Sequence, residues 1–112
     1  MLLLIRLFVI ILSIGLAHAA AQDKTKDYRN FWHPVYHKQR LNYCALDGKT
    51  CGLAIASRYC RLMGYERADQ EVIAHNIGAT RFMEGSAYCR GWQCDGFKMI
   101  RCVGRLTHKP VA

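Results

Sequence analysis

Five histidines and six cysteines are the side chains of this 112-residue chain best suited to catalysis or metal binding. A small basic hydrolase that cleaves RNA would use histidines to move protons and a cation to hold phosphate. The candidates are His33, His37, His75 and His108, with Arg81 or Lys98. Glu71 and His75 form the best acid–base pair, because they would share a face if that segment were helical. Ordinary surface or half-buried roles explain the same histidines, so a non-enzyme is the favoured interpretation.

Other reactive chemistry has less support in the sequence. His33 and His37 have the spacing of metal ligands on a helix, but Pro34 between them favours an extended chain, with the two rings roughly 13 Å apart. The cysteines contain no Cys-x-x-Cys pair of the kind that binds zinc, and no Gly-x-Ser-x-Gly motif is present. We therefore expect no metal, no cofactor and no catalytic residue.

The first 19 residues have the three parts of a secretory signal peptide. Arg6 precedes an apolar run from Leu7 to Leu16, and small residues follow at Ala17 and Ala19. The apolar run is shorter than the roughly 20 residues that span a bilayer, and no later run approaches that length. We expect a secreted or periplasmic chain with no transmembrane segment after cleavage.

An even number of cysteines in a short exported chain predicts a disulfide framework and no free thiol. The six are Cys44, Cys51, Cys60, Cys89, Cys94 and Cys102. Cys89–Cys94 would close a tight loop with Trp92 at its tip. Cys60, on a helix, needs a partner on a strand, for which Cys102 is the choice. Cys44–Cys51 then remains, although fifteen connectivities are possible for six cysteines.

The helix and strand patterns around these cysteines predict an α+β domain, with one main helix at about residues 51–63 packed on a short antiparallel sheet. The predicted inner stripe of the helix is Leu53, Ala56, Cys60 and Met63. Thr50 is the expected N-cap and Gly64 the expected end. Phe97 to Val103 is predicted to be a central strand, because both of its faces carry apolar residues. Its predicted faces are Phe97, Met99 and Arg101 on one side and Lys98, Ile100 and Cys102 on the other.

The remaining chain divides into flanking segments. Residues 20–42 are predicted to be a mobile lead-in arm, 43–103 the disulfide-stabilised domain, and 104–112 a frayed tail. The arm contains the aromatic segment 31–37, which either packs on the domain or stays exposed to bind a partner. The segment from Glu66 to Ile77 fits a helix or a strand equally well.

The cysteine pattern also resembles a group of small cysteine-rich proteins exported by bacteria, some of them from host-associated species with type II secretion. The shared residues are Cys44-Ala-x-Asp-Gly-x-x-Cys51-Gly, Tyr59-Cys60-x-x-x-Gly64-Tyr65, Gly78-Ala-Thr-Arg and Cys89-x-Gly-Trp-x-Cys94-x-Gly-Phe97-x-x-Ile100-x-Cys102. The resemblance implies export and a role as a secreted effector. It supplies no catalytic residue.

The formal net charge of +8 favours approach to phosphates, anionic lipids or sulfated glycans. No run of five like charges is present, so nucleic acid is not expected as a partner. The residues expected to bind are Trp92, Arg90, Phe97, Lys98 and Arg81. We expect a monomeric binding protein for an anionic surface, a glycan or a host protein. The alternatives are a small basic hydrolase such as a ribonuclease and, third, a membrane-active toxin-like protein.

Overall fold

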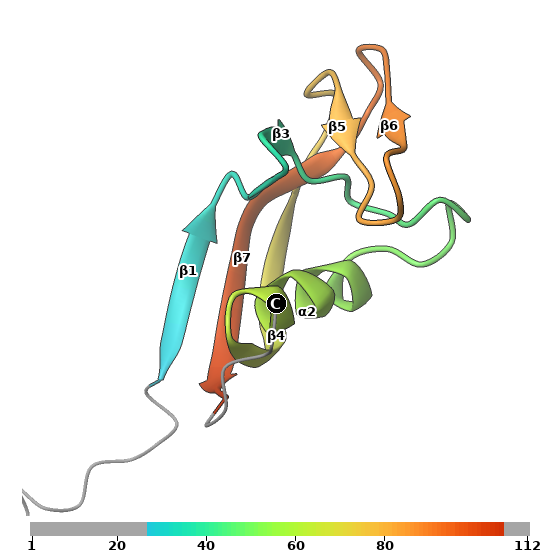
Figure 1. Cartoon of the computed structure of the whole chain (residues 1–112). Helices are drawn as coiled ribbons and strands as arrows, with labels where there is room; N and C mark the ends of the chain where they lie inside the picture. The colour runs from blue at the N-terminus through green and yellow to red at the C-terminus, as the bar shows by residue number, and fades with distance from the viewer. Residues whose placement is uncertain (1–26, 107–112) are drawn as a thin grey trace, which may run out of the picture.

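The computed structural model describes residues 27–106, so the predicted signal peptide and the residues after 106 lie outside the described part. Its strands and helix are β1 (Tyr28–Trp32), β2 (Val35–Tyr36), β3 (Gln39–Arg40), α2 (Leu53–Leu62), β4 (Tyr65–Ala74), β5 (Thr80–Arg81), β6 (Tyr88–Cys89) and β7 (Gly96–Arg105). The main sheet is antiparallel with the order β1-β7-β4. Helix α2 lies against one face of β4 and β7 (Figure 1). The predicted α+β fold is confirmed.

Strand β7 is central, as its apolar residues on both faces predicted. The helix begins at Leu53 and ends at Leu62, within two residues of the predicted limits. The ambiguous segment is a strand rather than a helix, because β4 pairs with β7 along most of its length. Two short hairpin ladders, β2–β3 and β5–β6, complete the described part.

The prediction of a mobile arm is wrong for residues 28–42. Strand β1 pairs continuously with β7, from Tyr28 opposite Val103 to Trp32 opposite Met99. Phe31 packs edge-to-face against Tyr59, with ring centroids 5.4 Å apart, and Leu41 is fully buried. The expected start of the tail also changes, because β7 continues to Arg105. Apolar contacts and strand pairing to distant residues hold this segment on the domain.

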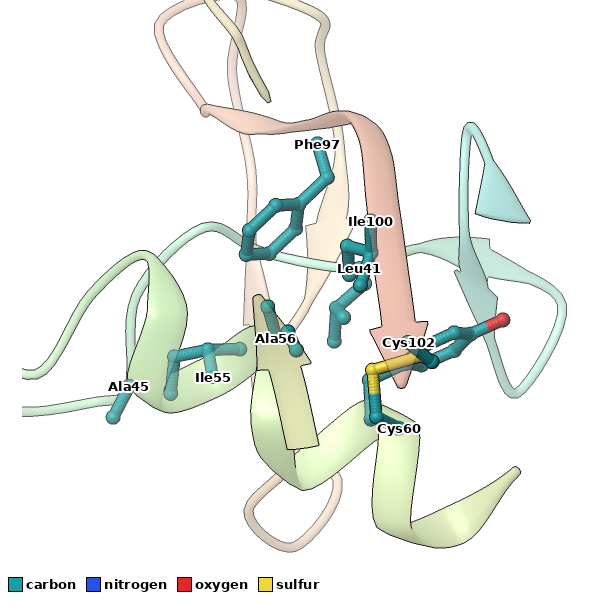
Figure 2. Packing of buried hydrophobic residues seen from close by; sticks show 10 residues of the cluster. Leu41, Ala45, Ile55, Ala56, Cys60, Phe97, Ile100 and Cys102 are labelled. Atoms are coloured by element: carbon teal, nitrogen blue, oxygen red, sulfur yellow. A yellow bond between two sulfur atoms is a disulfide. The ribbon is translucent and has the colours of Figure 1, made fainter. Parts of the chain in front are cut away.

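The hydrophobic core lies between α2 and the sheet (Figure 2). Phe97, Leu41, Ile55 and Ile100 are its largest fully buried apolar side chains. Figure 2 also shows the Cys60–Cys102 disulfide crossing from the helix to β7. The bridge therefore lies within the core.

The buried stripe of α2 differs from the predicted one. Its buried residues are Ile55, Ala56, Tyr59 and Cys60, whereas Leu53 and Met63 are 49% and 43% exposed. Ala56 and Cys60 were assigned correctly. Leu53 starts the helix and Met63 lies just beyond its last residue, so neither is covered by the sheet as the middle turns are.

The predicted N-cap at Thr50 is also wrong. The Thr50 hydroxyl donates to the Asp47 carboxylate at 2.7 Å, and Gly52 is the N-cap, with φ 67° and no side-chain capping bond. At the other end Gly64 has φ 92°, the positive value expected of the residue that terminates the helix.

Two irregularities in the β4–β7 ladder change which side chains face the core. The register shifts between Ala68 and Gln70 and again between Val72 and Ile73. At the second shift Val72 is opposite Met99 but Ile73 is opposite Phe97, so Lys98 is the extra residue of a β-bulge. The bulge explains why Phe97 and Ile100 are both buried although strict alternation predicted opposite faces.

The three disulfides are Cys44–Cys51, Cys60–Cys102 and Cys89–Cys94, and no cysteine is free. The predicted pairing is confirmed at every position. Such a framework is typical of small domains that fold in an oxidising compartment. Between residues 27 and 106, no helix has the length and apolar character needed to cross a membrane.

Candidate functional site

The most exposed large hydrophobic side chain in the described residues is Trp92, at 74% exposure. It lies in the loop closed by the Cys89–Cys94 disulfide, whose cysteines are five residues apart. Gly91 just before it has φ 116°, and a Cβ there would lie 2.6 Å from Oε1 of Gln93. The positive φ favours glycine at this position, and the short closure of the loop holds the indole in solvent, as predicted.

The β5–β6 hairpin, which leads into this loop, holds the Arg81 guanidinium in place. Arg81 in β5 is opposite Tyr88 in β6; it donates to the Tyr88 hydroxyl at 2.7 Å and to the Gly85 carbonyl at 3.2 Å. The guanidinium also lies 5.0 Å from the Tyr88 ring centroid and 5.8 Å from that of Tyr36. Aromatic rings and neutral acceptors thus hold the Arg81 charge without neutralising it.

The other predicted binding residues differ in their exposure to solvent. Arg90 is exposed within the Trp92 loop, and Lys98 is exposed at the bulge of β7. Phe97 is fully buried and packs against Tyr43, with ring centroids 4.9 Å apart. Its assignment to the binding surface is wrong, because the bulge at Lys98 turns its ring into the core.

The predicted Glu71–His75 pair does not form, because β4 is extended and carries Glu71 to Tyr43 instead. His75 lies near Asp95, with Nδ1 3.4 Å from Oδ1. Asp95 also accepts a hydrogen bond from the Asn76 backbone at 3.0 Å. The His75 side chain is 66% exposed. This pair is an acid–base couple open to solvent beside the Trp92 loop.

The other histidine candidates within residues 27–106 do not converge with it. His33 and His37 are both exposed and both have positive φ, at the two ends of β2. His108 lies outside the described residues. Within residues 27–106, no group of three histidine, cysteine, aspartate or glutamate side chains is arranged to hold a metal ion.

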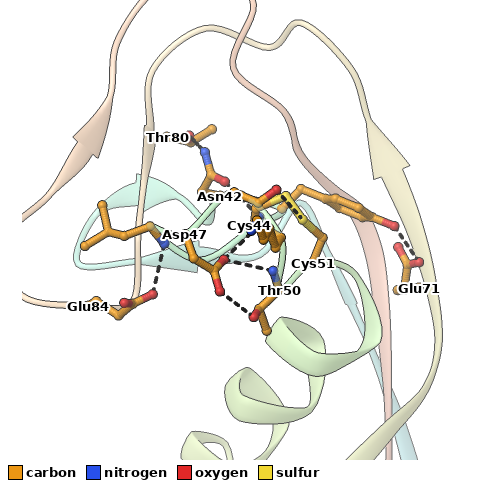
Figure 3. Close-up of a disulfide and its surroundings, with 12 residues drawn as sticks. Asn42, Cys44, Asp47, Thr50, Cys51, Glu71, Thr80 and Glu84 are labelled. Atoms are coloured by element: carbon orange, nitrogen blue, oxygen red, sulfur yellow. Dashed lines mark hydrogen bonds between the residues drawn. A yellow bond between two sulfur atoms is a disulfide. The ribbon is translucent and has the colours of Figure 1, made fainter.

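A shallow depression of about 400 Å³ beside the start of α2 was missed by the sequence reasoning. It is lined by Leu53 and residues 69–72 of β4. One of its lining residues, Glu71, accepts a hydrogen bond at Oε1 from the Tyr43 hydroxyl at 2.8 Å (Figure 3). Burial, with the bond to the carboxylate, raises the pKa of Tyr43 to about 12. No local pattern links Tyr43 to a residue so far along the chain, so the sequence carried no signal for this contact.

The turn beside the Cys44–Cys51 disulfide is held by Asp47 (Figure 3). Its carboxylate accepts from the backbone N–H groups of Lys49 and Thr50, both at 2.8 Å, and from the Thr50 hydroxyl. These bonds to Thr50 and Lys49 lower the pKa of Asp47. The cluster fixes a loop and presents no unused reactive group, which indicates a structural role.

No known protein family, curated protein or solved structure gives a significant match to this chain.

Proposed function

We propose that this protein is a secreted binding module that contacts an anionic glycan through Trp92, Arg81, Arg90 and Lys98. The observation that carries the proposal is the 74% exposure of Trp92 on a disulfide-closed loop. An apolar ring of this size in water favours a partner that covers it, and tryptophan and arginine dominate binding hot spots.

Charge defines the partner class. The chain has a formal net charge of +8. Within residues 27–106, the ion pairs are Glu66–Arg67, His75–Asp95 and Asp69–Arg101, so Arg81, Arg90 and Lys98 have no acidic partner there. Sugar rings stack on an indole, and sulfate or carboxylate groups match unpaired guanidinium groups. An acidic glycan offers both features in one ligand.

The test is a binding titration with a short sulfated oligosaccharide, using Trp92→Ala and the matched control Trp32→Ala. Trp32 is the second exposed tryptophan, at 60% exposure, and it belongs to β1 rather than to the disulfide loop. We expect Trp92→Ala to weaken binding by about 2 kcal/mol without lowering the melting temperature. Trp32→Ala should bind as the wild type does, and affinity should fall with added salt. Equal effects of both changes would refute the proposal.

One observation favours a second candidate. The His75–Asp95 contact of 3.4 Å is the kind of pair that a small hydrolase such as a ribonuclease needs for proton transfer. The exposure of His75 makes catalysis the weaker candidate, because water screens the site and, within residues 27–106, no second histidine joins His75 and Asp95. RNA cleavage by the purified protein that disappears in His75→Ala would establish the enzyme instead. Release of dye from anionic vesicles would favour the membrane-active alternative.

A further inference from the structure

Within residues 27–106 no strand pairs with the outer edge of β1, which presents a row of backbone N–H and C=O groups. The Gly104 N–H donates to the Asp27 carbonyl at 3.2 Å, and the His33 N–H donates to the Lys98 carbonyl at 2.9 Å. Both bonds lie in register with the β1–β7 ladder. Because hydrogen-bonded residues alternate along an antiparallel strand, Arg29 and Phe31 direct their backbone groups toward β7. Tyr28, Asn30 and Trp32 therefore direct theirs outward, and no described strand pairs with them.

The opposite edge of the sheet is protected. The β4–β7 ladder has two register shifts, and the one between Ala68 and Gln70 places an extra residue in β4, where a bulge bends the edge and interrupts its row of donors. The Ala68 N–H on that edge is already bonded to the Ser57 hydroxyl at 3.0 Å. Strand β1 lacks bulges of this kind, because its pairing with β7 has no register shift. It also has few of the charged residues that protect an edge, since Arg29 is its only one. Of the two edges of the main sheet, β1 is the one prepared to accept another strand.

The sequence of β1 is complementary to itself when two copies run antiparallel about Asn30. Tyr28 of one copy then lies opposite Trp32 of the other, and Arg29 lies opposite Phe31. Aromatic pairs stabilise neighbouring strands, and an arginine against an aromatic ring is a favourable cation–π contact. Within the chain Arg29 already lies 4.7 Å from the Phe31 ring centroid. In this register Tyr28, Asn30 and Trp32 all meet outward-facing residues, so each opposed pair exchanges two backbone hydrogen bonds.

We propose that the protein forms a reversible two-fold dimer by pairing β1 with β1 of a second copy, centred on Asn30. Neighbouring registers are less favourable, because one places Arg29 against Arg29 and both leave fewer outward residues paired. The two copies build one continuous six-stranded sheet with both helices on the same side. This departs from the monomer expected from sequence and does not depend on the glycan proposal.

The test is sedimentation of the oxidised protein over a concentration series up to about 1 mM, because a strand pair alone is smaller than a standard stable interface. Asn30→Pro removes the central outward N–H but no bond to β7, and proline is tolerated at such edges. We expect its dimer dissociation constant to rise roughly 30-fold or more, since both hydrogen bonds of the central pair are lost. Asn30→Ala, which keeps the backbone donor, should still dimerise. Near-ultraviolet circular dichroism checks that both variants are folded.

The register has its own test by nuclear magnetic resonance. Tyr28 and Trp32 are four residues apart on one strand, roughly 13 Å, too far for a nuclear Overhauser contact within one copy. In the proposed dimer their rings lie on opposed residues, so a contact between them should appear with concentration and vanish in Asn30→Pro. A wild-type protein that stays monomeric throughout the series would overturn the proposal. So would a dimer that Asn30→Pro leaves intact.

Discussion

Removing the Cys60–Cys102 disulfide should cost more stability than removing any other bridge. It closes a loop between residues 42 positions apart, whereas the separations are 7 for Cys44–Cys51 and 5 for Cys89–Cys94. The chain-entropy relation then gives a loss of about 4 kcal/mol for the long loop. It gives about 2 kcal/mol for each short one.

The structure adds to this difference. Cys60 and Cys102 are both fully buried, so two alanines leave a small cavity between α2 and β7. The loop of Trp92 lies outside the core, and Cys89 is only half-buried. The matched comparison is therefore Cys60→Ala with Cys102→Ala against Cys89→Ala with Cys94→Ala.

Urea unfolding gives the free energy of unfolding of each double variant, and thermal unfolding gives a second measure. For a domain of this size each kcal/mol shifts the melting temperature by about 4–8 °C. We expect a drop of roughly 16–32 °C for the core bridge and roughly half of that for the Trp92 loop. Equal losses, or a larger loss for Cys89 and Cys94, would refute the assignment of Cys60–Cys102 as the central cross-link.

Two further predictions concern a glycine and two carboxylates. Gly52→Ala should lower the free energy of unfolding by about 1–3 kcal/mol. Urea unfolding should show a smaller loss for the control variant Gly48→Ala. Both glycines have φ +67°, but only at Gly52 would a Cβ meet the Tyr43 hydroxyl, at 3.0 Å. The pKa values of Asp47 and Asp69 are lowered by hydrogen bonds from Thr50 and from Arg101, so stability is present at neutral pH and is lost as pH falls through the folded-state values. The free energy of unfolding measured from pH 7 to pH 2 should fall less steeply in Asp47→Asn with Asp69→Asn, and an unchanged slope would contradict this reasoning.

Local patterns were enough to predict the helix and the disulfides. Ala56 and Cys60 share a helical face, and a bridge from that face was expected to reach a strand, for which Cys102 was the choice. The short spacing of Cys89 and Cys94 predicted an exposed Trp92 for the same local reason. Each of these inferences needed only neighbours in sequence or one face of one element.

Contacts between segments far apart in the sequence could not be predicted from local patterns. Phe31 pairs with Ile100, and Tyr43 bonds to Glu71, but neither residue carries a local mark of its partner. Strand β4 shows no clean alternation of apolar and polar residues, because the register shift between Ala68 and Gln70 interrupts it. The bulge at Lys98 broke the alternation that placed Phe97 on the wrong side.

The two proposed surfaces act together if both are present. The Trp92 loop immediately precedes β7 and lies beyond that end of the main sheet in Figure 1. Antiparallel pairing through β1 turns the second copy end for end, so the two Trp92 loops lie at opposite ends of the six-stranded sheet. A long acidic polysaccharide can then contact both loops, whereas a short oligosaccharide reaches only one. The second contact becomes intramolecular, and avidity of this kind raises affinity without any new contact within either site.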